Sequence, residues 1–492
     1  MTQLSRSSPE AQGISSRAIS SFLDAVAEEG LELHSLMLVR HGHVIAEGWW
    51  EPYTADSIHL LYSLSKSFTA TAVGMAVEEG LLSVEDKVVS FFPDETPEDA
   101  GENLKTMQVK HLLSMATGHV ADTMERIVRT DDWVKSFLAI PPDRAPGTVF
   151  CYNNGSTFML SAILFKLTGV SLLEYLKPRL LEPLGIDQAR WQENPQGIQL
   201  GFTGLHVTTE SIAKFGQLYL QEGQWQDQQL ISGKWVDQAS SQHIPSASPG
   251  QEEDKFDWQQ GYGFQFWMCR HGAYRGDGAF GQFCVVMPEQ DAVFAATSGE
   301  DDMQATLDAV WKHLLTAMQP QALEADSESQ QDLKYKLENL AHVPIHGEAE
   351  TAIAAKVDGK TYTFEQVDLD PETARNFGAL IPKSICLQKL GLEQNEHWLL
   401  TYTSEQTFQL NCGYREWSNY STSFYSGDSE RVAVSGAWTA EDTFTLHIRY
   451  VETPHCLRLE LHFFEDELTL DLSWNVAFGP TRAPQLVAKR TT

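Results

Sequence analysis

Apolar and polar positions follow two different periods at the start of the chain, and each period predicts one kind of element. Ile19, Phe22 and Val26 recur at the spacing of one helical face. Two apolar runs follow, over 35–40 and 44–49, on either side of a His-Gly-His turn. Such a pair is typical of a β-hairpin. The chain is therefore expected to begin with a helix and two adjacent strands.

The next part of the chain is predicted to be mainly helical. Residues 63–80 combine small and apolar side chains, contain no proline and end in a glycine. A long apolar helix is expected over 157–168 and an amphipathic helix over 209–222. Proline and glycine punctuate the connections, as in the run 141–147, which is interpreted as a rigid loop.

Alternation returns after this helical part. Strands are expected over 262–267, 282–287 and 292–297, and a closing helix over 302–318. Strands at both ends of a region with a helical middle indicate a single domain over residues 1–318. Its predicted fold class is α/β (α+β), with a mixed antiparallel sheet and a helical insert packed beside it.

A polar, acidic segment over 319–334 follows and is interpreted as a linker. Beyond it, residues 335–492 contain short alternating segments separated by turn residues. The clearest of these segments are 360–364, 385–390, 398–402, 444–450, 457–463 and 468–474. Short strands of this kind predict a smaller antiparallel β domain, either a barrel or a curved sheet.

Composition and charge restrict the partners. The chain is 42% apolar, as in soluble globular proteins, and its formal charge is −32. This negative charge argues against nucleic acid and against an anionic membrane as main partners, although solubility alone would also explain it.

The remaining composition bears on location and cofactors. The N-terminus has no apolar segment typical of a secretory signal, and no apolar run is long enough to span a membrane. The six cysteines are scattered without the spacing of redox or metal sites. We therefore expect a cytoplasmic, reduced protein that uses no metal and no cofactor.

Ser63 and Lys66 are the first candidate catalytic residues. They stand three positions apart at the start of the predicted helix 63–80, so their side chains share one face. A serine hydroxyl needs a base to become a nucleophile, and a buried lysine that loses its charge can be that base. The helix start also offers backbone N–H groups to an oxyanion. The alternative is an N-cap serine followed by a solvated lysine.

Tyr152 and Asn154 form a second candidate pair, between the proline-glycine loop and the helix over 157–168. A tyrosine beside a lysine ammonium can have a lowered pKa and can pass a proton to or from a leaving group. Asn154 can hydrogen-bond the substrate or the lysine. The alternatives are a half-buried loop aromatic for Tyr152 and a helix cap for Asn154.

Gly276, Gly278 and Ala279 lie in a glycine-rich run that opens a strong predicted strand. Glycines allow the backbone to approach another group closely. The N–H of Ala279 would then be available as an oxyanion donor. The alternative explanation is a tight turn between two strands.

Together these motifs resemble the serine β-lactamase-like and penicillin-binding-protein-like hydrolases, in the class C-like group of esterases and peptidases. Ser63-Leu-Ser-Lys66 is similar to the S-x-x-K motif of that family, and Tyr152-Asn-Asn154 to its Y-x-N motif. The segments 111–118 and 181–185 resemble further sequence segments shared by that family, and the resemblance covers roughly residues 9–318. It implies a β-lactamase/transpeptidase-like fold for this part of the chain.

The resemblance also implies an activity, namely cleavage of an ester or amide in a small-molecule or short-peptide substrate. Ser63 would attack the carbonyl, and Lys66 would act as the base. Tyr152 would pass a proton to the leaving group, and Asn154 would position the acyl side chain. The N–H groups of Ser63 and Ala279 would form the oxyanion hole.

The third motif departs from the family pattern. β-Lactamases and penicillin-binding proteins carry K-T-G there, and many related esterases carry H-x-G or W-x-G, whereas this chain has Gly276-Asp277-Gly278. The cation that often meets a substrate carboxylate is therefore missing, which disfavours β-lactamase and carboxypeptidase activity. Arg270 and Arg275 stay open as substitutes for that cation.

Several functions stay open at this point. A D-amino-acid-specific peptidase and a weak β-lactamase fit the same residues. A non-catalytic binding or scaffold protein would share the fold without turning over a substrate. The β domain, in turn, could join copies of the chain into a homo-oligomer, or could cover the active-site mouth and restrict substrate size.

Overall fold

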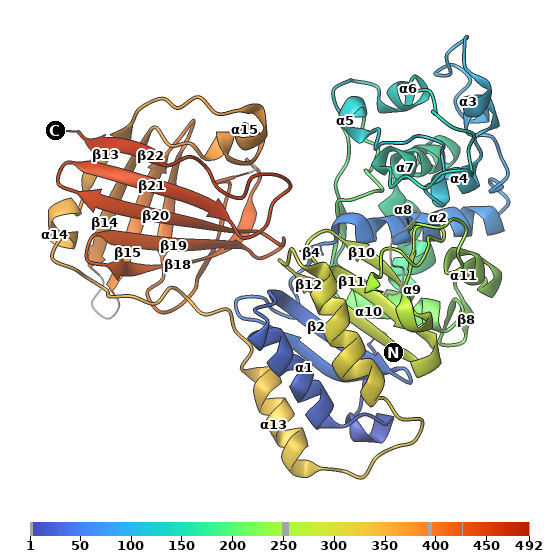
Figure 1. Ribbon diagram of the computed structural model, residues 1–492, viewed down its shortest axis with the longest axis horizontal. Coiled ribbons are helices and arrows are strands. Elements are labelled where there is room, and N and C mark those ends of the chain that lie inside the picture. Colours follow the sequence, from blue (N-terminus) through green and yellow to red (C-terminus); the bar gives the residue numbers. More distant parts are fainter. Residues whose placement is uncertain (1–2, 248–254, 392–395, 426, 492) are drawn as a thin grey trace. The chain divides into compact units, whose positions relative to one another are not determined.

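In a computed structural model of the chain, the described residues are 3–247, 255–391, 396–425 and 427–491, and they form two compact units (Figure 1). The first unit comprises the described residues of Met1–Gly48, Ile58–Ser298 and Asp302–Asn339. The second comprises those of Trp49–Ser57, Gly299–Asp301 and Leu340–Thr492. Each unit has a large sheet of its own.

The first unit is built on a seven-stranded sheet with the order β1-β3-β2-β12-β11-β10-β9. β1 runs parallel to β3, whereas β2, β12, β11, β10 and β9 pair in antiparallel fashion. The strands are β1 Ser5–Arg6, β2 Leu33–Arg40, β3 His43–Trp49, β9 Trp267–Met268, β10 Tyr274–Gly278, β11 Gln282–Met287 and β12 Ala292–Ser298. Shorter strands are β4 His59–Leu60, β5 Arg190–Trp191, β6 Leu205–Val207, β7 Gln224–Trp225 and β8 Gln228–Gln229. The mixed sheet predicted from both ends of this region is thus confirmed.

Helices cover both faces of this sheet. Phe22 packs edge-on against Phe294 at 5.7 Å, whereas the neighbouring Val293 faces Gly216. Successive strand residues point to opposite faces, so the helices that carry Phe22 and Gly216 lie on opposite sides. The helices of this unit are α1 Ser16–Glu28, α2 Ser65–Glu78, α3 Glu102–Thr106, α4 Val109–Leu113, α5 Met124–Ile127, α6 Trp133–Leu138, α7 Asn154–Thr168, α8 Leu172–Leu176, α9 Glu182–Leu184, α10 Thr209–Leu220, α11 Gly233–Ala239, α12 Met303–Ala309 and α13 Ser327–Glu338.

Helix α2 is the central helix of the insert. It is buried on every side from Ser65 to Ala76, as expected for a helix that is apolar or small all round. A Cβ atom on Gly74 would come within 2.5 Å of the Trp235 ring, so that ring packs directly on the helix backbone. This burial holds the first turn of α2 in a fixed position.

One predicted strand is wrong. Of the segment 262–267, only Trp267 enters a strand, β9. Gln265 has a φ of 62°, and its side-chain amide donates to the carbonyls of Leu112 and Leu113. Its aromatic neighbours Tyr262 and Trp267 instead share a small core cluster. Aromatic packing, and not a strand, therefore explains the alternation.

The segment predicted as a linker contains the start of α13, which contacts α1. Gln330 donates to a carboxylate oxygen of Glu10 at 2.7 Å, and Lys336 pairs with Asp24 on α1. The structure therefore attaches α13 to the first unit.

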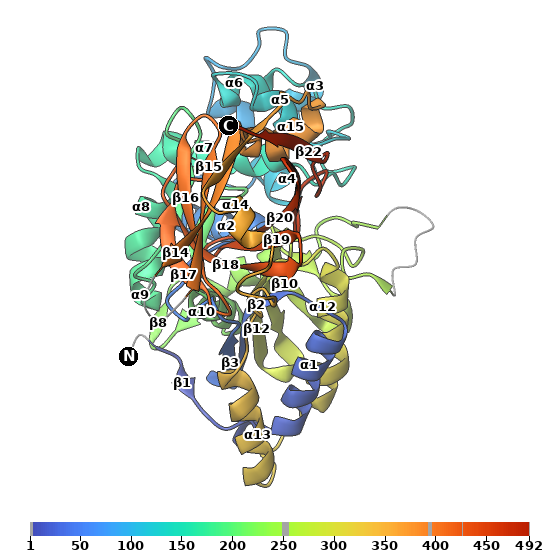
Figure 2. The same cartoon turned by 90° about the vertical axis from the view of Figure 1, so that its left-hand side faces the viewer.

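The second unit contains a ten-stranded antiparallel sheet with the order β16-β15-β14-β13-β22-β21-β20-β19-β18-β17, seen in Figure 2. A bridge from Gly413 to Ser435 joins the end of β16 to β18, so the sheet curves until it nearly closes. This confirms the barrel-like sheet. The strands are β13 Lys360–Phe364, β14 Ser384–Gly391, β15 Glu396–Thr403, β16 Thr407–Cys412, β17 Ser418–Thr422, β18 Glu430–Ala440, β19 Thr443–Tyr450, β20 Cys456–Phe464, β21 Glu467–Trp474 and β22 Leu486–Arg490.

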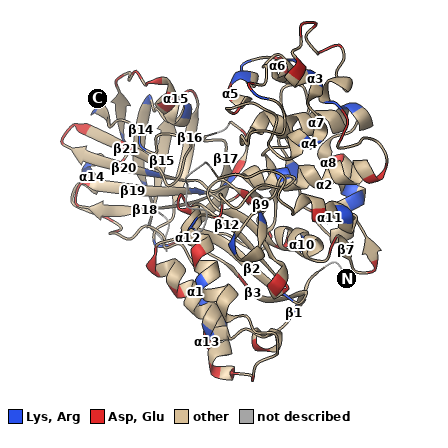
Figure 3. Cartoon of the chain, turned by 45° about the vertical axis from the view of Figure 1, so that its right-hand side comes forward, with Lys and Arg blue, Asp and Glu red and all other residues tan. Residues whose placement is uncertain are grey.

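Two short helices, α14 Ala354–Val357 and α15 Pro371–Phe377, accompany this sheet. Figure 3 shows acidic and basic residues on both units. Over the described ranges, no individual helix has the length and apolar character needed to cross a membrane; one bent pair, Asn154–Thr168 with Leu172–Leu184, meets those criteria jointly.

Candidate active site

Ser63 and Lys66 lie side by side at the N-terminal end of α2. Ser63 is the middle residue of a short 3-10 turn, Tyr62–Leu64, which leads directly into the helix. Tyr62 has a φ of 45°, a conformation that L residues rarely adopt and that recurs at functional sites. The Lys66 Nζ atom donates to Ser63 Oγ at 2.8 Å. The structure thus brings together the two residues that the sequence spacing predicted.

The Lys66 amine is buried among three acceptors. Besides Ser63 Oγ, its Nζ donates to Asn154 Oδ1 at 2.8 Å and to the Phe202 carbonyl at 2.9 Å. Burial lowers the pKa of Lys66 to about 7, against the opposing effect of the Asp122 and Asp277 carboxylates. The amine is therefore able to exchange a proton near neutral pH. Nothing in the sequence indicated the Phe202 carbonyl, because a backbone group has no residue signature.

Tyr152 borders the same cluster, just before α7. Lys66 Nζ lies 4.7 Å from the centre of the Tyr152 ring, and the ring stacks on Trp267 with 5.4 Å between centroids. The expectation of a lowered pKa is wrong. Burial, and then the Asp277 carboxylate, raises the pKa of Tyr152 well above its usual value, against a hydrogen bond with Ser63. Tyr152 therefore keeps its proton and is suited to donate it.

Asn154 is fixed by a residue that the sequence did not reveal. Asp122 accepts from the Asn154 backbone N–H at 3.0 Å and from its side-chain Nδ2 at 2.6 Å, which turns Oδ1 toward Lys66. The cap of α7 is the neighbouring Asn153, whose side chain accepts from Gly155 N. Asn154 is thus free of the capping role that was its alternative explanation.

Gly276 and Gly278 press strand β10 against the start of α2. A Cβ atom on Gly278 would lie 2.0 Å from the Leu61 carbonyl and 3.1 Å from Ser63 N, and one on Gly276 would lie 2.5 Å from Ser67 Oγ. Only glycine permits this approach. The half-exposed Ala279 follows the end of β10, so the strand terminus passes beside Ser63.

We expect Gly278→Ala to damage both stability and activity. The new methyl group would overlap the Leu61 carbonyl, so the strand must move away from Ser63. We expect a loss of about 2 kcal/mol in the free energy of unfolding. Because small misplacements cost catalysis steeply, kcat/KM should also fall about a hundredfold. Denaturant unfolding and steady-state kinetics measure the two effects.

Gly101→Ala is the matched control, because a Cβ atom at Gly101 meets nothing within 4 Å. Its φ of −72° also suits alanine. Both quantities should stay near their wild-type values. A Gly278→Ala protein as active as this control would show that the close approach is not needed.

The arginines near the third motif are committed to carboxylates. Arg275 is fully buried and pairs with Asp277 at 2.9 Å. Arg270 pairs with Asp257 at 2.7 Å and also with Asp308. Neither arginine therefore replaces the missing cation. The sequence did not indicate that Asp277 forms this buried ion pair, because the run Gly276-Asp277-Gly278 was notable only for the missing cation.

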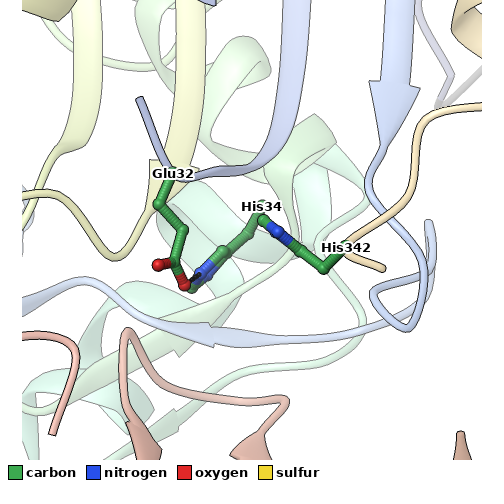
Figure 4. A group of neighbouring side chains, drawn as sticks. All are labelled: Glu32, His34 and His342. Carbon is green, nitrogen blue, oxygen red and sulfur yellow. Dashed lines mark hydrogen bonds and ion pairs between the residues drawn. The ribbon is translucent and has the colours of Figure 1, made fainter. Parts of the chain in front are cut away.

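Two buried histidines, His34 and His59, lie next to each other in the first unit. His34 Nδ1 is 3.1 Å from His59 Nε2, and His34 Nε2 is 3.5 Å from Glu32 Oε1, a pair drawn in Figure 4. His59 belongs to β4, and its Nδ1 lies 3.0 Å from the Leu60 carbonyl. Both histidines are buried, and these contacts tie the ends of β2 and β4 together.

Comparisons with known proteins bear on the family and the fold of the chain. The model of the Beta-lactamase family matches residues 23–316. Penicillin-binding protein 4 of Amycolatopsis lactamdurans is 31% identical over 150 residues, which are 30% of this chain and 39% of that protein. The 6-aminohexanoate-dimer hydrolase of Paenarthrobacter ureafaciens is 23% identical over 285 residues, 54% of this chain and 73% of that protein.

Among solved structures, the hydrolase EstCE1, described as having promiscuous acyltransferase activity, is similar with a TM-score of 0.50. The two chains are 15% identical, and the match covers 60% of this chain and 99% of that one. The likeness concerns the fold. The match with penicillin-binding protein 4, by contrast, spans less than half of that protein's length.

Proposed function

Because the chain belongs to the Beta-lactamase family, we propose that it is a serine hydrolase that cleaves an ester or amide through an acyl-enzyme on Ser63. Membership confirms the resemblance seen in the sequence. The mixed sheet with its helical insert likewise confirms the β-lactamase/transpeptidase-like fold.

One observation carries the proposal. The Lys66 amine contacts Ser63 Oγ at 2.8 Å and is buried enough for its pKa to fall to about 7. A nucleophile needs a base within hydrogen-bond reach whose pKa lies near the working pH. A solvated first-turn lysine would have neither property.

The residues then divide the reaction between them. Neutral Lys66 takes the Ser63 proton as Oγ forms its bond to the substrate carbonyl carbon. The N–H groups of Ser63 and Ala279 stabilise the oxyanion. Tyr152 donates its proton to the leaving group as the bond between that group and the carbonyl carbon breaks. Lys66 then passes its extra proton to Tyr152. In the second half of the reaction, Lys66 takes a proton from a water molecule as the water oxygen attacks the acyl carbon, and passes that proton to Ser63 Oγ as the bond from Oγ to the acyl carbon breaks. Asn154 holds the lysine and the acyl side chain.

A substrate panel tests the proposal. It comprises p-nitrophenyl esters, D-aminoacyl amides and nitrocefin, with a fluorophosphonate probe that labels active serines. We expect turnover of at least one ester or amide and labelling of the wild type. Absence of both labelling and turnover would favour a non-catalytic binding or scaffold protein of the same fold. Turnover of the D-aminoacyl amides or of nitrocefin would narrow the hydrolase to a D-peptidase or a β-lactamase.

We expect kcat/KM to fall as the pH drops below about 7. Lys66 has a pKa of about 7 and acts only when neutral, so protonation at lower pH removes the base. The pH profile of kcat/KM on a neutral ester should therefore show an acidic limb near that value. Circular dichroism over the same pH range separates this limb from unfolding. A flat profile across neutral pH in folded protein would contradict the role of Lys66.

A further inference from the structure

We propose that Asp277 selects against negative charge on the leaving group, so that the natural substrates are esters or amides with a neutral or cationic leaving group. This inference rests on the proposed function, because it concerns the substrate of the same site. Asp277 acts in it as a specificity-determining residue, at the place where related enzymes carry a motif that meets a carboxylate.

The position of Asp277 follows from the strand that carries it. Gly276 and Gly278 face the start of α2, so Asp277 between them faces the opposite side of β10. Its carboxylate is hydrogen-bonded to Trp267, the ring on which Tyr152 stacks. The carboxylate is therefore one side chain away from the group that protonates the leaving group.

The Asp277 carboxylate is paired with a permanent cation. Burial raises the pKa of Asp277 above its ordinary value, and Arg275, which donates to the carboxylate at 2.9 Å, opposes that rise. A guanidinium does not lose its proton in proteins. Protonating Asp277 would leave the fully buried Arg275 without a counter-charge, which is strongly unfavourable.

The two charges of the ion pair have different neighbours. The Arg275 guanidinium donates to the Asp257 carbonyl at 2.9 Å and lies 4.3 Å from the Trp258 ring and 5.8 Å from the Trp267 ring, whereas the Asp277 carboxylate is hydrogen-bonded to Trp267. At Tyr152 the influence of Asp277 on the pKa exceeds that of Arg275. A leaving group held beside Tyr152 would therefore lie near the Asp277 carboxylate, whose negative charge Arg275 does not fully offset there.

The consequence is a charge preference at one end of the substrate. A leaving-group carboxylate next to Asp277 would place like charges together in a poorly hydrated site, which is costly. An ammonium group there would be attracted instead. A neutral leaving group would be tolerated.

Three aryl butyrates that differ in the charge of one meta substituent on the leaving group test this preference. Their leaving groups are meta-hydroxybenzoate, meta-hydroxybenzamide and meta-hydroxyphenyltrimethylammonium, and each rate is divided by its uncatalysed rate. At about pH 8, where Lys66 is neutral, we expect kcat/KM for the anionic ester to be at least about tenfold below that of the neutral ester. The cationic ester should be at least as good as the neutral one. Equal values for all three would overturn the proposal.

The net charge of −32 offers a competing explanation, because it repels every anionic substrate from a distance. Salt separates the two effects. Long-range repulsion is screened at about 0.5 M salt, whereas the effect of a buried carboxylate persists. A preference that disappears in salt would overturn the role of Asp277.

Variants assign the preference to the residue. Asp277→Asn should raise kcat/KM for the anionic ester about tenfold relative to the neutral one. Because this change leaves Arg275 unpaired, the double variant Arg275→Gln/Asp277→Asn, which removes both charges, is made in parallel and should also lose the preference. Glu102→Gln, which removes an exposed acidic group on α3, should keep it. A preference retained by both the single and the double variant would contradict the inference.

The test distinguishes failure of the inference from failure of the proposed function. Ser63-dependent turnover of the neutral ester without charge preference would reject the role of Asp277 alone. Absence of turnover on all three esters, with no fluorophosphonate labelling, would reject the hydrolase function itself.

Discussion

Ser63→Ala is expected to abolish hydrolysis, with kcat reduced about 10⁴-fold or more. The substitution removes the atom that would form the acyl-enzyme, and it leaves the Lys66 amine bonded to Asn154 and the Phe202 carbonyl. The fold should therefore survive. Turnover of the best ester and labelling by a fluorophosphonate both measure the effect, and labelling should disappear.

Ser65→Ala is the control for this experiment. Ser65 is two positions away, and its buried hydroxyl accepts from Leu205 N at 3.1 Å, so it supports the fold. We expect a modest loss of stability, about 1 kcal/mol, with hydrolysis and labelling retained. Labelling that survives in Ser63→Ala and disappears in Ser65→Ala would move the nucleophile to Ser65.

Lys66→Met is expected to reduce kcat/KM about a thousandfold or more at neutral pH. Methionine fills a similar volume, but it cannot accept the proton of Ser63 or return a proton to Tyr152. Far-UV circular dichroism and steady-state kinetics on a neutral ester are the measurements. Activity within tenfold of the wild type would exclude Lys66 as the base.

Lys66→Met also tests the lowered pKa of Lys66, through the pH dependence of the free energy of unfolding. Lys66 has a pKa of about 7 in the folded chain, below its ordinary 10.5, so between these values the unfolded chain binds more protons. The stability of the wild type relative to Lys66→Met should therefore rise with pH across this window, by up to about 1.4 kcal/mol per pH unit. A constant difference would contradict the lowered pKa.

Lys214→Met is the matched control, because Lys214 on α10 is also buried. Its Nζ donates to the Gly185 carbonyl at 3.3 Å, and no residue of the candidate site is among its partners in the described structure. We expect changed stability with unchanged kcat/KM. Loss of activity in this variant as well would mean that lysine removal acts through the fold.

Local patterns predicted most of the first unit because they depend on near neighbours. The helical spacing of Ile19, Phe22 and Val26 predicted α1, and the alternating runs 282–287 and 292–297 predicted β11 and β12. The same reasoning failed for 262–267, where aromatic alternation reflects a core cluster. It did not single out β16, β17 and β18, which pair with the strand next to them along the chain, nor β22, which pairs with β21 and with the distant β13.

The sequence alone also identified the pairing of Ser63 with Lys66, since residues one helical turn apart must meet. Tyr152 and Asn154 were predicted from their place between the proline-glycine loop and the apolar helix, and the structure shows that α7 begins at Asn154. The sequence did not predict which charged groups surround these residues, or how they shift the pKa of Tyr152. The pKa of Tyr152 was expected to fall because of a lysine, but burial and Asp277 raise it.

What only the tertiary structure decided is which charged and polar groups meet at the candidate site. The carboxylate of Asp122 fixes Asn154, the Phe202 carbonyl holds Lys66, and Arg275 neutralises Asp277 in part. These contacts join segments far apart in the chain or depend on the side of a strand that faces the core. Electrostatic energies inside a protein depend on distance and burial, which no local pattern encodes. The sequence by itself therefore determined the proposed reacting groups, and the fold determined their protonation and the charge that surrounds them.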